Sequence, residues 1–230
     1  MFLTKKSSAM PQRTGAIARA LCRLREAQAQ APRRVRIGFI IDATGSREAG
    51  WEQAQRAQRR IFSAVAGFGA VKLRLQHFGG GELTDHGWRD DSMELAAAMA
   101  AVRCRTGLTQ ILPALQSFIG EDEPAAAVIL VGDSFEENPD AVAGTLPFLR
   151  AGGTRIFAFF EGNDAHAEAV FRRMAEGTNG RFARLGADLP LGDLCEGVAL
   201  LAAGGSRAIK QLKNERARRL LLAAPAPRKE

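Results

Sequence analysis

Short, mostly apolar runs alternate along this chain with longer segments of helical pattern, and this alternation limits the possible folds more than any other feature. Three of the runs are Val35–Ile41 (VRIGFII), Ala126–Val131 (AAVILV) and Arg155–Phe160 (RIFAFF). Apolar runs of this length are typical of strands buried on both faces, which occur mainly in parallel sheets covered by helices. The sequence therefore predicts an α/β protein with a doubly wound, mostly parallel sheet.

The segment Val71–Phe78 (VKLRLQHF) differs from these runs because it alternates apolar and polar residues. It is followed by GGGEL, so we expect an amphipathic strand near an edge, joined by a hairpin to a short strand over Glu82–Trp88. The hairpin adds one antiparallel edge strand to a Rossmann-like sheet, and a last short strand is expected over Arg181–Leu185. Helices are predicted over Glu48–Val65, Asp91–Val102, Thr109–Ile119, Pro139–Leu149, Ala165–Glu176 and Leu191–Lys213, the last weakened at Gly204-Gly205.

Charge is unevenly distributed along the 230 residues, whose formal net charge is +7. Residues 1–36 carry a net charge of +8 and residues 207–230 carry +6, whereas residues 37–206 carry −7. We divide the chain into a basic N-terminal appendage (1–33), a domain (34–206) and a basic C-terminal helix or tail (207–230) that extends the last helix. Basic ends can contact nucleic acid, anionic lipid or an acidic protein, or can simply be solvated.

Composition narrows the classes of function. Aromatic residues make up 7% of the chain and tyrosine is absent, which argues against an aromatic platform for nucleic-acid bases. The cysteines Cys22, Cys104 and Cys195 are far apart and form no C-x-x-C pair, which predicts reduced thiols, a cytoplasmic location and no zinc site. The start of the chain has no apolar signal region and no run approaches the ~18 apolar residues of a membrane span, so we expect no transmembrane segment.

Polar side chains follow two of the predicted buried strands. Asp42 comes directly after the first strand, with Thr44 and Ser46 at alternate positions beyond it, and Asp133 follows the strand AAVILV. The carboxyl ends of parallel strands meet at one edge of a sheet, where Thr109, at the predicted start of a helix, would join them. Two carboxylates and three hydroxyls are hard oxygen donors that suit Mg²⁺ or Mn²⁺. The five residues therefore predict a divalent metal site.

The order Asp42-x-Thr44-x-Ser46, then Thr109, then Asp133 resembles the metal-ion-dependent adhesion site of von Willebrand factor type A (vWA) domains, in which Asp-x-Ser-x-Ser precedes a distant Thr and a distant Asp. The T-x-x-x-x-A-L that begins at Thr109 and MAEGTNGRF at residues 174–182 are also similar to that family, and the resemblance covers roughly residues 35–210. Thr44 replaces the usual first Ser, and Asp133-Ser134 replaces a frequent Asp-Gly. Neither change removes a donor oxygen.

The resemblance implies how such a site would work. In the family, the two hydroxyls and the distant Thr bind the metal directly, the Asp residues often act through water, and a carboxylate of a partner protein takes the sixth position. The chain is thus expected to be a non-enzymatic interaction module of the intracellular bacterial type. Relatives of that type suggest an adaptor in a multi-protein complex, for instance with an AAA+ ATPase or a kinase–phosphatase system.

Other interpretations remain open from the residues alone. Asp42 could be a phosphoryl-accepting nucleophile, but Thr44 stands where such enzymes have a second acid, and no Lys lies between residues 73 and 209. The basic arms could instead serve a nucleic-acid-associated protein. Other groups that could carry chemistry are a transition-metal cluster at His77, Asp85 and His86, a reactive thiol at Cys104, and acids at Glu136, Glu137 and Asp140 that are either solvated or repel acidic ligands.

Overall fold

The computed structural model describes residues 34–51, 55, 71–186 and 189–223. The chain divides into two compact units, Met1–Arg34 and Val35–Glu230, and the sheet belongs to the second. The predicted appendage at 1–33 therefore lies outside the described residues, as does most of the predicted helix Glu48–Val65, of which Trp51 and Gln55 are described and helical. None of the described helices is both long and apolar enough to cross a membrane.

A single mixed sheet forms the centre of the second unit, in the order β3-β2-β1-β4-β5-β6. Every neighbouring pair is parallel except β2 and β3, which form the predicted antiparallel hairpin at one edge. The predicted fold class is thereby confirmed. The strands are β1 (Val35–Asp42), β2 (Val71–Gly79), β3 (Glu82–Arg89), β4 (Ala127–Gly132), β5 (Arg155–Phe160) and β6 (Arg181–Arg184).

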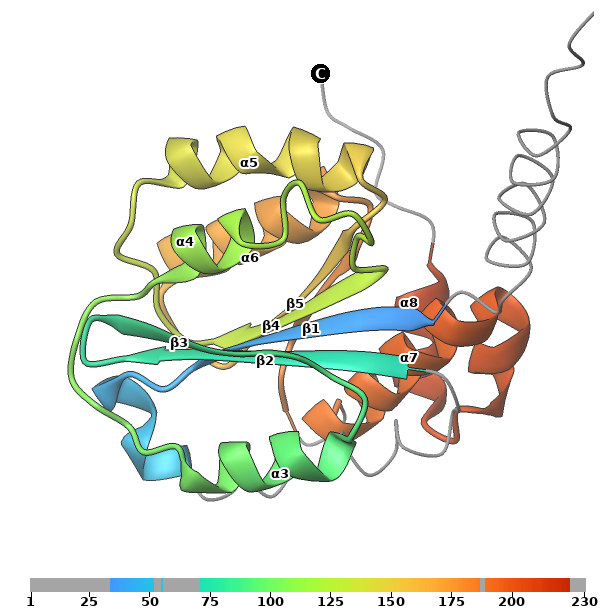
Figure 1. Cartoon of the computed structure of the whole chain (residues 1–230), viewed down its shortest axis with the longest axis horizontal. Helices are drawn as coiled ribbons and strands as arrows, with labels where there is room; N and C mark the ends of the chain where they lie inside the picture. The colour runs from blue at the N-terminus through green and yellow to red at the C-terminus, as the bar shows by residue number, and fades with distance from the viewer. Residues whose placement is uncertain (1–33, 52–54, 56–70, 187–188, 224–230) are drawn as a thin grey trace, which may run out of the picture. The chain divides into compact units, whose positions relative to one another are not determined.

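Helices cover both faces of the sheet (Figure 1). On one face α4, α5 and α6 pack on side chains such as Ile40 and Leu130, and on the other α3 and α7 pack on Phe39 and Ile129. Successive strand residues point to opposite faces, so the continuous apolar runs supply both cores at once. The helices are α3 (Ser92–Ala101), α4 (Ile111–Gln116), α5 (Pro139–Ala151), α6 (Ala165–Gly177), α7 (Leu191–Ala208) and α8 (Glu215–Leu222), with 3₁₀ turns η1 (Gly45–Gly50) and η2 (Ile209–Gln211).

Four of the described helices begin at side chains that accept hydrogen bonds from the free backbone N–H groups of the first turn. Asp91 caps α3, Asn138 caps α5, Asp164 caps α6 and Asn214 caps α8. In α5 the next residue is Pro139, whose missing N–H costs nothing at the first helical position. These caps fix where each helix leaves the loop before it, and two of those loops follow the strands β4 and β5.

The polar face of β2 is buried, which the alternating pattern did not predict. β2 lies next to the edge strand, as expected, but Arg74 is 8% exposed and Gln76 is fully buried. Arg74 Nε donates to Asp85 Oδ1 at 3.0 Å and its Nη1 donates to Glu121 Oε1 at 2.9 Å, while Gln76 Nε2 donates to Ser117 Oγ at 2.8 Å. Alternation of polar and apolar residues identifies the polar face of a strand. Whether that face is exposed to solvent depends on the elements that pack against it.

The last predicted helix, Leu191–Lys213, is interrupted at the Gly204-Gly205 pair that was expected to weaken it, whereas its expected extension by the tail is wrong. α7 is interrupted at Gly205, whose φ of 62° and ψ of −154° are not helical, and α8 is a separate helix after η2. Side chains of the segment that the charge pattern set apart at 207–230 lie in the same core as α7 and the sheet. They are Ile209, Leu212, Ala217 and Leu221.

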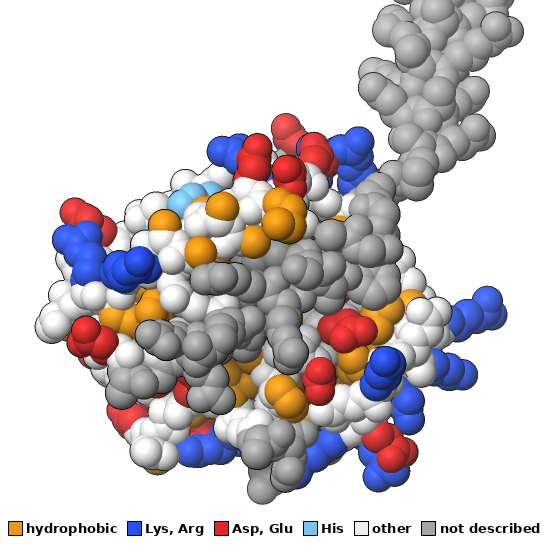
Figure 2. Space-filling model, turned by 90° about the horizontal axis from the view of Figure 1, so that it is seen from below, with side chains coloured by type: hydrophobic (Ala, Val, Ile, Leu, Met, Phe, Trp, Pro, Cys, Tyr) orange, Lys and Arg blue, Asp and Glu red, His pale blue; other side chains and the backbone are white. Residues whose placement is uncertain are grey.

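The basic residues of α8 lie on its solvent side. Arg219 contacts Glu215 one turn earlier, with a distance of 2.8 Å from Nη2 to Oε1, and Arg218 lies 3.7 Å from the same carboxylate oxygen. Figure 2 shows basic and acidic side chains interspersed at the end of the molecule where α7 and α8 lie. Pairs of this kind on an exposed helix contribute little stability, typically about 0.3–0.5 kcal/mol each.

Candidate metal site at the carboxyl end of the sheet

The first and last of the predicted site residues lie at neighbouring strand ends. Asp42 is the last residue of β1 and is fully buried, and Asp133 follows β4, which pairs with β1 in parallel register. Gly132 makes room for the Asp42 carboxylate, because a Cβ at Gly132 would lie only 3.2 Å from Asp42 Oδ2. The absence of a side chain at Gly132 therefore leaves space for the Asp42 carboxylate at the carboxyl end of the sheet, which we call the rim.

Four of the five predicted residues are joined by a chain of hydrogen bonds. The N–H and the Oγ1 hydroxyl of Thr44 both donate to Asp42 Oδ1, at 2.8 and 2.6 Å. Thr44 Oγ1 and Ser46 Oγ are 3.1 Å apart, and Ser46 Oγ donates to Asp133 Oδ1 at 3.1 Å. Thr44 has an extended backbone before η1 begins, so the chain turns there and both hydroxyls face the carboxylates.

Thr109, the fifth predicted residue, makes no hydrogen bond to these four and is bound to Glu136 instead. Its side chain is fully buried, its N–H donates to Glu136 Oε2 at 2.9 Å, and its Oγ1 accepts from the N–H of Glu136 at 3.2 Å. α4 begins at Ile111, two residues later than predicted. The loop before it runs alongside the first one, because Thr44 and Arg105 form a parallel bridge.

The acids after β4 hold this loop in place. Besides the bonds between Glu136 and Thr109, the carboxylate of Glu137 accepts from the N–H groups of Ile111 and Leu112, at 2.7 and 2.8 Å. Both hypotheses for Glu136 and Glu137, a solvated helix start or a field that repels acidic ligands, overlooked this role. These carboxylates satisfy the free N–H groups at the start of α4.

One oxygen of Asp42 lacks a hydrogen-bond donor within the described part of the chain. Asp42 Oδ2 is buried and accepts no hydrogen bond from any described residue. Burial raises the pKa of Asp42 from 3.8 to about 6; the Thr44 hydrogen bonds and the charge of Arg47 oppose this shift, and the charge of Asp133 adds to it. A buried carboxylate oxygen without a donor is costly unless a proton or a cation meets it. The oxygens of this rim therefore fit a hard divalent cation.

Sequence reasoning missed Arg47 and Glu161. Arg47 is 5% exposed, its Nη1 donates to the main-chain oxygen of Asp42 at 2.8 Å, and its Nη2 donates to Glu161 Oε2. Glu161 directly follows β5, so it stands at the same sheet edge as Asp42 and Asp133. An acid after a third apolar strand was a visible signal for Glu161, whereas nothing local in the sequence distinguishes Arg47 from a surface arginine.

The other chemical hypotheses find no support in the described part of the chain. No group of three or more His, Cys, Asp or Glu side chains is placed to hold a metal ion there. The rings of His77 and His86 stack with centroids 5.4 Å apart, and the Asp85 carboxylate is bound by Arg74. Burial raises the pKa of the Cys104 thiol to about 11, which opposes formation of a reactive thiolate.

Comparison with known proteins identifies the fold. No protein-family model matches the sequence, and a search of curated proteins finds no match. Solved structures do match: a von Willebrand factor type A protein from Catenulispora acidiphila has a TM-score of 0.58 and 14% identity over 74% of this chain and 43% of that one. The SpRpn10 VWA domain has a TM-score of 0.57 and 11% identity over 74% of this chain and 97% of that one.

A third match is proximal thread matrix protein 1 from the mussel byssus, solved with a zinc-occupied MIDAS motif. Its TM-score is 0.59, with 19% identity over 74% of this chain and 46% of that one. This chain therefore spans less than half of the mussel protein and of the Catenulispora protein. At these identities the likeness is one of fold: the chain has the α/β fold of vWA domains.

Proposed function

We propose that this protein is a non-enzymatic interaction module that holds Mg²⁺ or Mn²⁺ at its adhesion-type site and binds an acidic residue of a partner protein through that cation. The residues that would hold the cation are Asp42, Thr44, Ser46, Thr109 and Asp133. The observation that carries the proposal is the unpartnered Oδ2 of Asp42, which is buried beside a hydrogen-bonded chain of oxygen donors.

The composition of the donor set supports binding of an anion. When bound, the cation would supply a positive charge that the three hydroxyl ligands do not neutralise and that Asp42 and Asp133 would neutralise only in part when they act through water, so a carboxylate from outside would be attracted to it. Ser46 is exposed, so the oxygens reach the protein surface at that point. Arg47 would keep the Asp42 main chain in place while its charge is balanced by Glu161.

Two features favour this proposal over phosphoryl transfer. Asp42 is fully buried and hydrogen-bonded through one oxygen, whereas a nucleophile must reach its substrate. Residue 44 is a threonine, so the second acid of an aspartate-dependent phosphatase is missing. An adaptor role in the cytoplasm, with an AAA+ ATPase or a kinase–phosphatase system as partner, belongs to the same proposal. The free thiols of Cys104 and Cys195 support the cytoplasmic location.

Metal-dependent thermal stability of the full chain tests the site. A cation with a Kd one-hundredth of its concentration stabilises the fold by about 2.7 kcal/mol, which for a chain of this size corresponds to a rise in Tm of roughly 5–10 °C. Asp42→Ala should abolish the rise, and Ser46→Ala, at an exposed position, should reduce it without a folding defect. Asp122→Ala is the matched control, because Asp122 is exposed and precedes β4 at the opposite end of the strand.

Two results would contradict the proposal. One is an unchanged Tm of the wild-type chain at millimolar Mg²⁺ and Mn²⁺, and the other is an equal rise in Asp42→Ala. Hydrolysis of p-nitrophenyl phosphate that disappears in Asp42→Asn would support the enzyme instead. The partner is tested by using the intact chain as bait in Mg²⁺ and in EDTA. A specific partner should be retained only in Mg²⁺ and lost with Asp42→Ala.

A further inference from the structure

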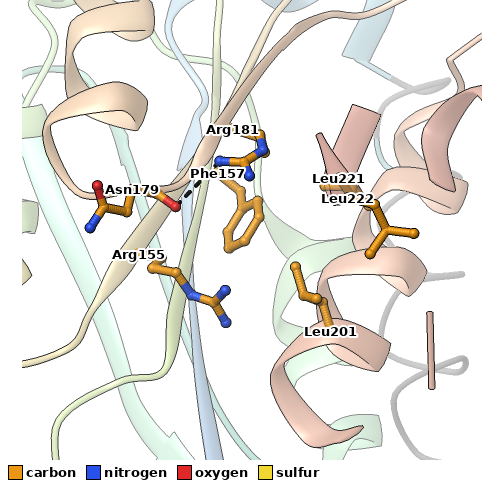
Figure 3. Close-up of a pocket in the computed structure, with 7 residues that line it drawn as sticks. All are labelled: Arg155, Phe157, Asn179, Arg181, Leu201, Leu221 and Leu222. Atoms are coloured by element: carbon orange, nitrogen blue, oxygen red, sulfur yellow. Dashed lines mark hydrogen bonds between the residues drawn. The ribbon is translucent and has the colours of Figure 1, made fainter. Parts of the chain in front are cut away.

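A pocket lies at the amino ends of β5 and β6, at the opposite edge of the sheet from Asp42. Its volume is about 150 Å³. Figure 3 shows two arginines on either side of a phenylalanine ring, with leucines facing them from α7 and α8. The lining residues are Arg155, Phe157, Asn179, Arg181, Leu201, Leu221 and Leu222.

The two arginines are not neutralised by any described carboxylate. The Arg155 guanidinium forms no hydrogen bond or ion pair with a described residue, and it lies over the ring of Phe157, 5.8 Å from Cζ to centroid. Among the described residues, Arg181 donates only to main-chain carbonyls: Nη1 to Gly180 at 2.6 Å, a longer contact to Asn179, and Nη2 to Ala223. Arg181 Nε is buried without a partner in the same described region.

Burial and mutual repulsion make the two charged guanidinium groups energetically unfavourable in this pocket. Burial lowers the pKa of Arg155, and burial together with the charge of Arg155 lowers the pKa of Arg181. Two partly buried like charges that line one cavity repel each other, and an anion between them would relieve that repulsion. Guanidinium groups also match carboxylates with paired, charge-assisted hydrogen bonds.

The other side of the pocket is lined by apolar side chains, so a ligand that pairs with the arginines should also carry an apolar group. Phe157 and Leu221 are almost fully buried, at 1% each, whereas Leu222 is 41% exposed and stands at the opening. A cavity of this volume lined by leucine and phenylalanine side chains accepts a ring the size of benzene. Inorganic phosphate would satisfy the arginines but leave the apolar wall unfilled.

We propose that this pocket binds a small organic carboxylate whose apolar part is the size of a benzene ring or a short branched chain. The carboxylate would pair with the guanidinium groups of Arg155 and Arg181, and the apolar part would contact Phe157 and the leucines of α7 and α8. Because the pocket uses none of the residues of the carboxyl-end rim, it is independent of the proposed metal site.

Benzoate is a suitable probe, titrated into the full-length protein and followed by calorimetry and by amide chemical shifts. We expect saturable binding, with shifts confined to the pocket residues. Benzamide, the neutral isostere, should bind at least tenfold more weakly, and inorganic phosphate should also bind at least tenfold more weakly. Arg155→Gln and Leu222→Ala should each weaken benzoate binding by at least tenfold. Arg155→Lys, which keeps the charge but not the planar fork, should weaken it less.

The control is Arg150→Gln, which changes an exposed arginine of α5 and should leave benzoate binding unchanged. Equal binding of benzoate and benzamide would overturn the proposal, since the arginines would then play no part. Phosphate binding as tight as benzoate binding, unaffected by Leu222→Ala, would indicate an adventitious anion only. Benzoate binding that survives Arg155→Gln in a variant with the wild-type Tm would also overturn it.

Discussion

Thr109 and Glu136 hold each other through two reciprocal hydrogen bonds, from the N–H of Thr109 to Glu136 Oε2 at 2.9 Å and from the N–H of Glu136 to Thr109 Oγ1 at 3.2 Å. The pair joins the loop before α4 to the loop after β4, two segments that are distant in the sequence. The oxygen that the metal proposal requires from Thr109 is therefore positioned by a residue outside the predicted site.

Replacing Glu136 with alanine should loosen this junction. The buried N–H of Thr109 loses its acceptor, so the free energy of unfolding should fall by about 1–2 kcal/mol. Hydrogen exchange should accelerate at the amide of Thr109 and stay unchanged in β5. Glu176→Ala, at an exposed position of α6, is the control. Unaltered exchange in the loop would show that the Glu136 carboxylate does not hold it.

Gly132→Ala should disturb the buried carboxylate directly. The added Cβ would lie 3.2 Å from Asp42 Oδ2 and 3.0 Å from Phe171 Cζ, so one of them must move. We expect a loss of about 1–3 kcal/mol of stability, measured by urea unfolding, and a smaller metal-induced rise in Tm. Gly144→Ala is matched to it, because a Cβ at this helical position meets nothing within 4 Å and should stabilise α5 by about 0.5–1 kcal/mol. Equal effects of the two substitutions would argue against crowding at the carboxylate.

His77 should make stability depend on pH. Burial, with a smaller effect from the charge of His86, lowers the pKa of His77 from 6.5 to about 4. The unfolded chain therefore binds more protons than the folded one between these values, and stability is lost as the pH falls through that window. His77→Gln removes this group, so the slope of stability against pH in that window should correspond to up to about one fewer proton taken up on unfolding. Comparing Tm at several pH values in wild type, His77→Gln and the exposed control His166→Gln measures this; identical slopes in all three would refute it.

Gly197→Ala should displace α8. A Cβ at Gly197 would lie 2.4 Å from Leu221 Cδ1 and 2.9 Å from Leu212 Cδ2, so α7 could no longer approach the segment after it. We expect a loss of about 1–3 kcal/mol and faster tryptic cleavage at the arginines of α8. Gly186→Ala adds a methyl where nothing lies within 4 Å, and it should leave both readouts as they are. Unchanged cleavage in Gly197→Ala would mean that α8 is not held by this contact.

The parts of the fold predicted well are those whose signal is local. The strands β1, β4 and β5 begin and end within a residue of the predicted bounds, because an unbroken apolar run is interpretable without knowing its neighbours. The positions of Asp42 and Asp133 at one rim followed from the same runs, since parallel strands align their carboxyl ends.

The features that were missed depend on contacts between segments distant in sequence. The buried face of β2 is explained by Asp85 and Glu121, and the role of Glu136 is explained by Thr109. Nothing local in the sequence marks Arg47 as buried, because its partner Glu161 is 114 residues away. Each is a polar residue whose environment is set by one particular partner, and hydrophobic periodicity carries no information about such pairs.

The break at Gly205 has a consequence for how this chain can diverge. Its φ of 62° and ψ of −154° lie in a region that is essentially reserved for glycine. The course of everything after α7 thus depends on one residue with no side chain, and so does the leucine wall that α8 supplies. A single codon change at that position could redirect or release the end of the polypeptide while leaving the sheet intact. The carboxyl-end rim with Asp42 could then be inherited unchanged while the pocket at the opposite edge of the sheet evolves.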